Sequence, residues 1–311
     1  MNLLSVQGLG VDLPMAGLFA RRRLNILSDI TFALSPGETM ALVGESGSGK
    51  TTLARAILGL QRISAGTLTV SGKALKSNQD FRNIRRNASL MFQDAVASLS
   101  PRMTVGQLVG EPFAIHKVPL PPGKVADLLA QVGLPAAIAA RYPHELSGGQ
   151  ARRVGVARAL ALQPKLVIAD EPTAGLDVSV QAEILNLMRD LQDDLNLTYL
   201  IISHNLALVR HVADRVAVMY LGRLVETGPT AKVFAAPRHP YTASLIAADP
   251  KPDPRQRRAD LAIKGEIPSI LRRPTGCEFH TRCPQAQPLC RTIAPQLIEK
   301  AAGHSARCHY T

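Results

Sequence analysis

The fold is decided by the stretch Gly44-Glu45-Ser46-Gly47-Ser48-Gly49-Lys50-Thr51, which fits the pattern G-x-x-x-x-G-K-[ST] at every fixed position. An apolar run at residues 40–43 precedes it, and a segment with helical periodicity at residues 52–58 follows it. This order of strand, glycine loop and helix turns backbone N–H groups toward one point, where the positive end of the helix dipole also lies. We call residues 44–51 the phosphate loop and predict that it binds a polyphosphate.

Two side chains at the end of the phosphate loop have specific predicted roles. Lys50 would reach the β- and γ-phosphates of a nucleotide as a point charge. The hydroxyl of Thr51 would be a ligand of the Mg²⁺ that accompanies the nucleotide. Thr52 follows at the start of the helix. We therefore predict a nucleotide site made by residues 44–52.

Composition excludes several classes of protein. The 311 residues carry a net charge of +12, and 46% of them are hydrophobic. We find no apolar run of the roughly 18–20 residues that a membrane-spanning helix needs, and no pattern of a cleaved signal peptide. Aromatic residues make up only 4% and do not alternate with basic ones, so we expect no nucleic-acid partner. The sequence predicts a globular cytoplasmic protein whose basic loops face a membrane surface or an acidic partner.

Short strands and an inserted helical region organise the first half of the chain. Residues 1–40 and 66–72 read as short strands that would form a small β layer beside the nucleotide. Between about residues 80 and 145 the pattern changes to helical segments broken by prolines such as Pro101 and Pro112. We predict a helical subdomain at about residues 80–160, inserted in the nucleotide-binding core.

A second glycine loop, Leu146-Ser147-Gly148-Gly149-Gln150, precedes an Ala/Arg-rich helix predicted at residues 151–162. Backbone N–H groups again lie at the start of a helix, and Ser147 is placed to cap that helix or to donate to an anion. Taken by itself, without the other motifs, this loop is interpreted as a turn that caps the following helix.

Two further apolar runs end in chemically active residues. Residues 166–173 begin as a strand buried on both faces and end in Asp170 and Glu171. Asp170 is suited to hold the metal, and Glu171, predicted to face the opposite way, to polarise an attacking water. A third strand, at residues 199–203, ends in His204. We predict that His204 faces the γ-phosphate from the same sheet edge.

These motifs, taken in their order, resemble the ATP-binding cassette over residues 1 to about 240. The motifs that carry the resemblance are the phosphate loop, Gln93, the second glycine loop, the strand ending in Asp170 and Glu171, Asp177, and His204. The resemblance implies an α/β fold of the P-loop NTPase (RecA-like) kind, with an antiparallel β subdomain, the inserted helical subdomain and a C-terminal extension at residues 241–311.

The resemblance also implies a site shared between two subunits. Ser147 and Gly149 would contact the γ-phosphate of ATP bound to the phosphate loop of a partner subunit, with Gly148 and Gln150 beside them. Gln93 would touch the Mg²⁺ and the water, and Asp177 would lie on the dimer seam. Binding of ATP would then close a head-to-tail dimer, and hydrolysis would release it.

Other stretches narrow the resemblance to the ATPase subunits of bacterial oligopeptide, dipeptide and nickel importers. They include residues 97–105, residues 142–147, residues 215–222 and His239-Pro240-Tyr241-Thr242. Such a subunit hydrolyses ATP to ADP and phosphate and is peripheral to the cytoplasmic face of the inner membrane. The resemblance implies as partners a second ATPase subunit, identical or homologous, two transmembrane permease subunits and an extracytoplasmic solute-binding protein.

All four cysteines fall near the C-terminus, at Cys277, Cys283, Cys290 and Cys308. In a cytoplasmic protein such clustering favours a metal over disulfides. The spacing is not a common zinc pattern, and four thiolates suit Zn²⁺ or an iron–sulfur cluster, with reduced thiols in a folded tail as the third possibility. The importer resemblance implies a [4Fe–4S] cluster.

Several positions depart from the family pattern. Ala95-Val96 replaces a proline–aromatic pair after Gln93, Gly175 replaces an alanine, and Asn205 stands where an aspartate generally follows the histidine; none of these removes a catalytic group. Leu13 lies where an aromatic side chain normally stacks on adenine, with Phe19 as the other candidate.

Two alternative functions carry different sequence features. A soluble cassette ATPase acting on nucleic acid or ribosomes would have a long coiled coil or a second phosphate loop, and this chain has neither pattern. A redox-regulated ATPase would use the cysteine tail to modulate hydrolysis.

Overall fold

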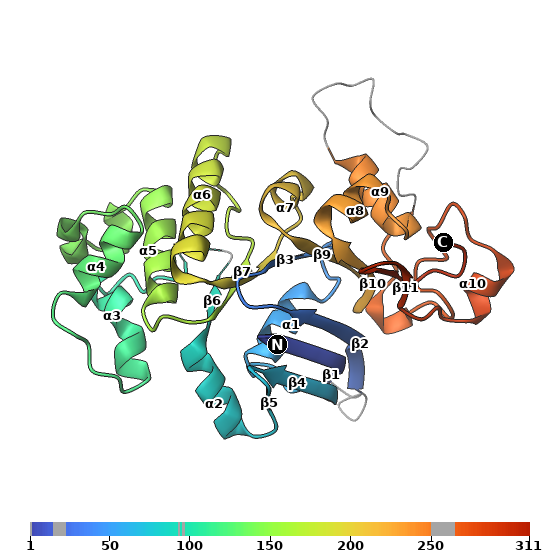
Figure 1. Ribbon diagram of the computed structural model, residues 1–311, viewed down its shortest axis with the longest axis horizontal. Coiled ribbons are helices and arrows are strands. Elements are labelled where there is room, and N and C mark those ends of the chain that lie inside the picture. Colours follow the sequence, from blue (N-terminus) through green and yellow to red (C-terminus); the bar gives the residue numbers. More distant parts are fainter. Residues whose placement is uncertain (1, 15–22, 93, 95–96, 250–264) are drawn as a thin grey trace. The chain divides into compact units, whose positions relative to one another are not determined.

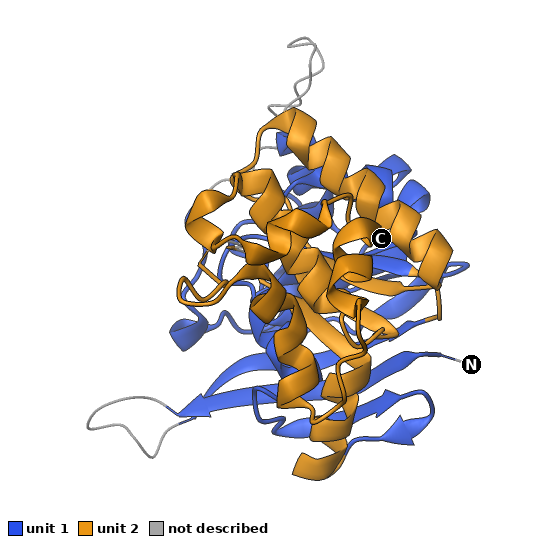
Figure 2. Cartoon of the chain, turned by 90° about the vertical axis from the view of Figure 1, so that its left-hand side faces the viewer, with its two compact units in different colours: residues 1–34, 39–75, 203–311 blue, residues 35–38, 76–202 orange. Residues whose placement is uncertain are grey.

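A computed structural model of the chain describes residues 2–14, 23–92, 94, 97–249 and 265–311. The chain divides into two compact units (Figure 2). The first comprises residues 1–34, 39–75 and 203–311, and the second comprises residues 35–38 and 76–202. Among the described residues, no helix combines the length and the apolar character that crossing a membrane requires.

The first unit contains a four-stranded antiparallel sheet in the order β2-β1-β4-β5. Its register aligns Leu4 with Leu34 on one side and with Val70 on the other. This sheet confirms the predicted β layer, although β1 and β2 are longer than the short apolar runs that indicated them. The strands are β1 (Leu4–Pro14), β2 (Arg23–Leu34), β4 (Ala65–Val70) and β5 (Lys73–Ala74).

A second set of strands in the first unit has the order β11-β12-β10-β9-β3. Only β3 and β9 are parallel to each other, and both are almost completely buried, as expected for strands covered on both faces. The strands are β3 (Thr39–Val43), β9 (Arg215–Tyr220), β10 (Arg223–Pro229), β11 (Ile298–Ala301) and β12 (His304–Ala306).

The helices of the first unit lie between its strands along the chain (Figure 1). The predicted helix after the phosphate loop is α1, which ends two residues before Gly59. The helices are α1 (Lys50–Ile57), α7 (Leu206–Val212), α8 (Thr230–Ala235), α9 (Pro240–Ala248), the 3₁₀ helix η6 (Ile270–Arg272) and α10 (Pro288–Thr292).

The second unit contains a parallel sheet in the order β8-β7-β6. The strands are β6 (Ala88–Met91), β7 (Leu166–Asp170) and β8 (Thr198–Ile202). β7 and β8 confirm the two predicted buried strands. β6 corrects the prediction that about residues 80–145 consist of helical segments broken by prolines. Four residues give no periodic signal, and Ala88–Met91 become a strand because they pair with Leu166–Ala169.

Helices make up the rest of the second unit, and α3, α4 and α5 pack together around Leu108, Leu129 and Val154. Pro112 lies inside α3, which corrects the prediction that it breaks a helix; the helix continues to Ile115, and His116 N–H donates to Pro112 O at 3.0 Å. The helices are α2 (Asn78–Asn87), α3 (Val105–Ile115), α4 (Lys124–Gln131), η2 (Ala136–Ala140), η3 (Pro143–Glu145), α5 (Gly148–Leu160) and α6 (Val178–Leu195).

Candidate functional site

The phosphate loop begins where the buried strand β3 ends. Gly44 has φ of 152°, and a Cβ atom on it would lie 2.2 Å from the carbonyl oxygen of Met219. Only glycine fits so close to another backbone. The buried apolar strand and this glycine therefore fix where the chain leaves the sheet and starts to curl.

The other end of the loop opens α1. Gly49 is the N-cap residue with φ of 104°, and no side chain caps the helix. A Cβ on Gly49 would lie 2.7 Å from Leu27 Cδ2. Uncapped N–H groups at a helix start are what an anionic ligand uses, so the geometry agrees with the predicted polyphosphate site.

Lys50 lies buried at the centre of the phosphate loop. Its Nζ donates to the carbonyl oxygens of Gly44 at 2.7 Å and Glu45 at 2.9 Å, and to Ser48 Oγ at 3.3 Å. The adjacent Thr51 is exposed. The ammonium group is thus held inside the curl of the loop by neutral acceptors, which anionic phosphate oxygens can replace with stronger charge-assisted bonds.

His204 follows Ser203, whose N–H donates to Leu42 O of β3 at 3.2 Å. This bond brings the start of the His204 segment beside the strand that leads into the phosphate loop, and His204 itself is exposed. Asn205 caps α7 by accepting from Leu208 N–H at 3.0 Å. An amide oxygen serves this cap as well as a carboxylate does, which accounts for the departure from aspartate.

In the second unit, the predicted metal ligand and base lie at the end of β7. Asp170 is buried and pairs with Ile202 of β8. Glu171 donates its N–H to Ile202 O at 2.9 Å and has φ of 50°. The strand therefore ends at Asp170. We expected the side chain of Glu171 to face away from that of Asp170, as neighbouring side chains do along an extended strand, but Glu171 is not part of the strand. A left-handed residue instead turns the chain there, at a conformational cost of about 1 kcal/mol.

The second glycine loop is capped and largely exposed. Ser147 Oγ accepts from Gln150 N–H at 3.2 Å, while Gln150 Oε1 accepts from Ser147 N–H at 3.1 Å. This reciprocal pair confirms the predicted cap of α5. A Cβ on Gly149 would lie 3.3 Å from Val180 Cγ1, so the loop runs beside the start of α6. Gly148 is exposed at the first position of the helix.

Asp177 caps α6 next to this loop. Its carboxylate accepts from Val180 N–H at 2.9 Å and from Ser179 Oγ at 3.0 Å, and these hydrogen bonds lower the pKa of Asp177. The buried Arg152 of α5 donates to Ala174 O at 2.8 Å. Sequence reasoning missed Arg152, which ties the helix after the second glycine loop to the segment before Asp177.

Two predictions fall on residues that the structure does not describe. Gln93, the proposed contact to Mg²⁺, and Phe19, a candidate for stacking on adenine, lie outside the described residues. Leu13, the other adenine candidate, is paired with Leu24 near the end of β1.

Family models match two parts of the chain. The model of the ABC transporter family covers residues 27–174, and the model of the oligopeptide/dipeptide transporter C-terminal region covers residues 225–290. The chain is 44% identical over 304 residues to the oligopeptide transport ATP-binding protein AppF of Bacillus subtilis, across 94% of this chain and 92% of that protein. The chain belongs to the ATP-binding subunits of oligopeptide/dipeptide ABC transporters.

Further relatives and solved structures agree with this family. This chain is 45% identical over 316 residues to a probable peptide ABC transporter ATP-binding protein, y4tS, of Sinorhizobium fredii. The match covers 99% of this chain and 89% of that protein. Among solved structures, cbiO1 of Clostridium perfringens matches with a TM-score of 0.66 and 29% identity over 76% of this chain and 91% of that chain. The dimeric cassette MJ0796 bound to ADP and phosphate has the same fold, with a TM-score of 0.65 and 23% identity over 73% of this chain and 98% of that chain. The predicted cassette fold is confirmed.

The C-terminal extension of the ABC ATPase is joined to the cassette by strand pairing and buried charge. β12 pairs with β10, and the buried Glu226 accepts from His304 Nε2 at 2.6 Å. The guanidinium of Arg307 is also buried and donates to Leu224 O at 2.9 Å and to Asp29 Oδ2 at 2.8 Å. The extension therefore folds onto the first unit as part of its sheet.

The four cysteines of the extension are free thiols that line one small cavity. Burial raises the pKa of Cys277 to about 12 and also raises the pKa of Cys283. The cavity measures about 20 Å³, which is room for about one water molecule. Within the described ranges, no group of three or more His, Cys, Asp or Glu side chains could hold a metal ion. The thiols have the donor chemistry of a metal site but not its geometry.

The extension also reaches the phosphate loop, through residues to which sequence reasoning gave no role. Arg282 donates from Nη1 to Glu45 Oε2 at 2.7 Å and from Nη2 to Glu45 Oε1 at 2.9 Å. These hydrogen bonds raise the pKa of Arg282. Glu45 N–H donates to the hydroxyl of Tyr241 at 2.9 Å. Tyr241 lies in the His239–Thr242 stretch that carried the family resemblance, whereas nothing near Arg282 in the sequence points to Glu45.

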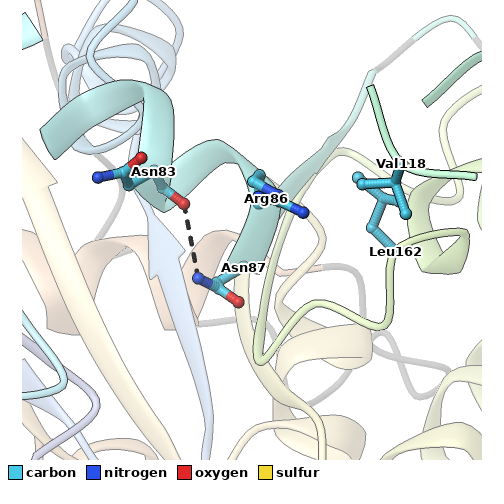
Figure 3. A pocket seen from close by; sticks show the side chains of 5 residues that line it. All are labelled: Asn83, Arg86, Asn87, Val118 and Leu162. Atoms are coloured by element: carbon cyan, nitrogen blue, oxygen red, sulfur yellow. Dashed lines mark hydrogen bonds between the residues drawn. The ribbon is translucent and has the colours of Figure 1, made fainter. Parts of the chain in front are cut away.

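A separate pocket of about 420 Å³ lies in the second unit. Figure 3 shows Asn87 donating from its side chain to Asn83 O, at 3.5 Å, on one side of this pocket. Its lining residues are Asn83, Arg86, Asn87, Val118 and Leu162. None of them belongs to the predicted nucleotide site.

Proposed function

We propose that this chain is the ATP-hydrolysing subunit that energises uptake of peptides, or of a related small solute, across the cell membrane. The observation that carries the proposal is the phosphate loop, in which the buried Lys50 Nζ lies 2.7 Å from Gly44 O and 2.9 Å from Glu45 O. The loop belongs to a chain whose relatives are similar to it over nearly their full length. The peptide as solute is supported by those relatives and by the C-terminal family model.

The residues proposed for the site would contribute different chemistry to ATP hydrolysis. Lys50 and the N–H groups of the phosphate loop would bind the β- and γ-phosphates, and His204 would stabilise charge on the transferring group. Glu171 would accept a proton from the attacking water and orient it. Thr51, Asp170 and Gln93 offer the oxygen ligands that Mg²⁺ prefers, and a bound Mg²⁺ would neutralise charge on the phosphates.

The second glycine loop would complete the nucleotide site of a partner subunit. Ser147 and Gly148 are exposed in this chain, and Gly149 is half-buried. We propose that they and Gln150 contact ATP on the partner's phosphate loop, with Asp177 at the seam. The partner would be a second ATPase subunit, identical or homologous, and the pair would act on two transmembrane permease subunits supplied by an extracytoplasmic solute-binding protein.

We infer that this subunit is peripheral to the cytoplasmic face of the inner membrane, where ATP and the permease are both accessible. The cassette would comprise residues 1–240, with the helical subdomain at about residues 80–160, and the extension residues 241–311.

Reconstitution tests this function. The subunit is assembled with its permease and binding-protein partners in vesicles that contain ATP, and uptake of labelled di- and oligopeptides is measured. Peptide uptake that requires ATP hydrolysis is expected. ATP hydrolysis stimulated by nickel complexes but not by peptides would identify another solute, whereas hydrolysis stimulated by DNA or ribosomes without permease would contradict the importer.

For the tail we propose that Cys277, Cys283, Cys290 and Cys308 bind a [4Fe–4S] cluster, with Zn²⁺ as the alternative. The support is that all four free thiols line one cavity. Binding would require a different arrangement of the thiols from the one in this structure, because the cavity has no room for a cluster. Anaerobically purified protein should contain iron and acid-labile sulfide in equal amounts; zinc without iron would support the alternative, and folded protein with neither would refute both.

A further inference from the structure

The segment between Cys277 and Cys283 makes three separate contacts with the cassette. Glu278, which is buried, lies 2.9 Å from Arg223 Nε through its Oε1. Phe279 packs against Tyr220 and Tyr241, with ring centroids 5.3 Å from each. Tight turns hold the segment together, because the N–H of residue 280 donates to Cys277 O and the N–H of residue 282 donates to Phe279 O. A short piece of backbone flanked by two thiols is thus fixed on the first unit.

The third contact is with the phosphate loop itself. Arg282 is 5% exposed in its side chain and pairs in bidentate fashion with Glu45, which is 22% exposed. Its guanidinium also lies over the ring of Tyr220, at 5.8 Å from the centroid. Tyr241, packed against Tyr220 at 4.7 Å, accepts the N–H of Glu45. Both the side chain and the backbone of Glu45 are therefore fixed by hydrogen bonds, the first to Arg282 and the second to Tyr241.

This arrangement matters because Glu45 is an acid within an anion-binding loop. Glu45 O is one of the acceptors of Lys50 Nζ, so a movement of Glu45 also moves the acceptor that places the ammonium group. Without Arg282, the carboxylate of Glu45 would repel phosphate groups and would be free to leave its position. The bidentate pair neutralises the carboxylate and fixes it with two parallel hydrogen bonds.

We propose that Arg282 is a positioning residue for the phosphate loop. We also propose that a chemical change at Cys277 and Cys283 alters the affinity for ATP through the segment between these two cysteines. This proposal rests on the proposed binding of ATP at the phosphate loop. Arg282 does not touch the nucleotide; it acts through Glu45. The extension is accordingly part of the support of the nucleotide site.

The test is the Kd for ATP, ADP and AMP of the full-length Arg282→Met variant, measured by calorimetry. The Kd for ATP should rise about tenfold or more, as expected when one partner of a buried charge pair is truncated. The rise should be smaller for ADP and smallest for AMP, because the loop contacts phosphates; a general loss of folding would weaken all three alike. Arg291→Met, an exposed arginine of α10 in the same extension, is the matched control and should leave all three constants unchanged.

Further variants keep the result interpretable. Arg282→Lys, which retains one charged donor, should bind ATP more tightly than Arg282→Met and also serves if the methionine variant does not fold. A Kd for ATP within twofold of the unsubstituted chain in both variants would overturn the positioning role. If Lys50→Ala also leaves ATP binding intact, the proposed nucleotide site itself fails; if Lys50→Ala abolishes binding while Arg282→Met does not change it, only the present inference fails.

Transmission from the thiols is tested by combining substitutions. Cys277→Ser/Cys283→Ser should raise the Kd for ATP in the otherwise unsubstituted chain and have no further effect in the Arg282→Met background. An equal additional rise in both backgrounds would show that the cysteines act by another route, and no rise in either would show that they do not act on the nucleotide site. Either result would overturn this part of the proposal.

Discussion

The two glycine loops open helices in the same way but are supported very differently. In the phosphate loop, Gly44 lies against the backbone of Met219, and Lys50 is buried among three acceptors. Arg282 and Tyr241 hold Glu45 from behind. In the second glycine loop, Ser147 is exposed and is fixed mainly by its reciprocal cap with Gln150.

This difference shows which of the two loops is supported by contacts within a single chain. Tertiary contacts fix the charged side chains and the backbone of the phosphate loop, so the entropy lost in ordering this loop is lost on folding and not on binding. The second glycine loop keeps its polar groups accessible beside the start of α6, as a loop completed by another subunit needs.

Lys50→Ala should produce the largest effect. Removing the buried ammonium group from the phosphate loop should weaken ATP binding and hydrolysis at least about a hundredfold, the scale seen when one stabilising donor is lost. Binding is measured by calorimetry and hydrolysis by phosphate release. Lys76→Ala, at an exposed position before α2, is the control. Unchanged ATP affinity in Lys50→Ala would place the nucleotide elsewhere.

Glu171→Gln should separate binding from chemistry. Hydrolysis in the assembled transporter should fall about 10²- to 10⁴-fold because the amide cannot take the proton, whereas the affinity for ATP should be kept. Light scattering should then show a dimer trapped by ATP. Glu183→Gln, an exposed acid of α6, should hydrolyse ATP normally. Steady-state hydrolysis unchanged by Glu171→Gln would remove this residue from the reaction.

Ser147→Arg tests whether the second glycine loop acts on the other subunit. In a mixed dimer with one substituted subunit, hydrolysis at the partner's phosphate loop should fall about tenfold or more, because a bulky cation disrupts a shared polar interface. The site on the substituted subunit itself should be less affected. Each site is read separately by adding Lys50→Ala to one subunit or the other. The reverse pattern would contradict a shared site.

His239→Asn should have the smallest effect and concerns the support of the phosphate loop. His239 caps α9, which carries Tyr241, and burial together with Arg307 lowers the pKa of His239 to about 3 from 6.5. Between these values the unfolded chain binds a proton that the folded chain does not, so the free energy of unfolding falls as the pH falls below 6.5. The slope is about 1.4 kcal/mol per pH unit at most.

Asparagine keeps a cap acceptor but does not titrate in this range. Urea unfolding from pH 7 to pH 4 should therefore show a flatter dependence on pH for His239→Asn than for the unsubstituted chain. Parallel curves for the two proteins would mean that His239 is not the group responsible.

Local patterns were enough to predict the elements that depend on their own residues. The phosphate loop, the cap at Ser147, and the buried strands β7 and β8 follow from glycine spacing, a capping pattern and apolar runs, and the structure confirms them. The sequence does not predict β6, because four residues are too few to show a periodic pattern. It does not predict the left-handed backbone at Glu171 either, because the residue there is neither glycine nor asparagine, which are the usual residues in that conformation.

The α/β nucleotide-binding fold and the family follow from the sequence alone, as do the groups proposed for catalysis, because each motif consists of residues that are close together in the chain. The contacts that hold the phosphate loop become visible only in the folded structure. The ion pair of Arg282 with Glu45 joins residues 237 positions apart, and the Tyr241 hydroxyl meets the same residue across 196. Such contacts leave no periodic pattern, since a single buried side chain can find its partner only after the sheet has brought the two segments together.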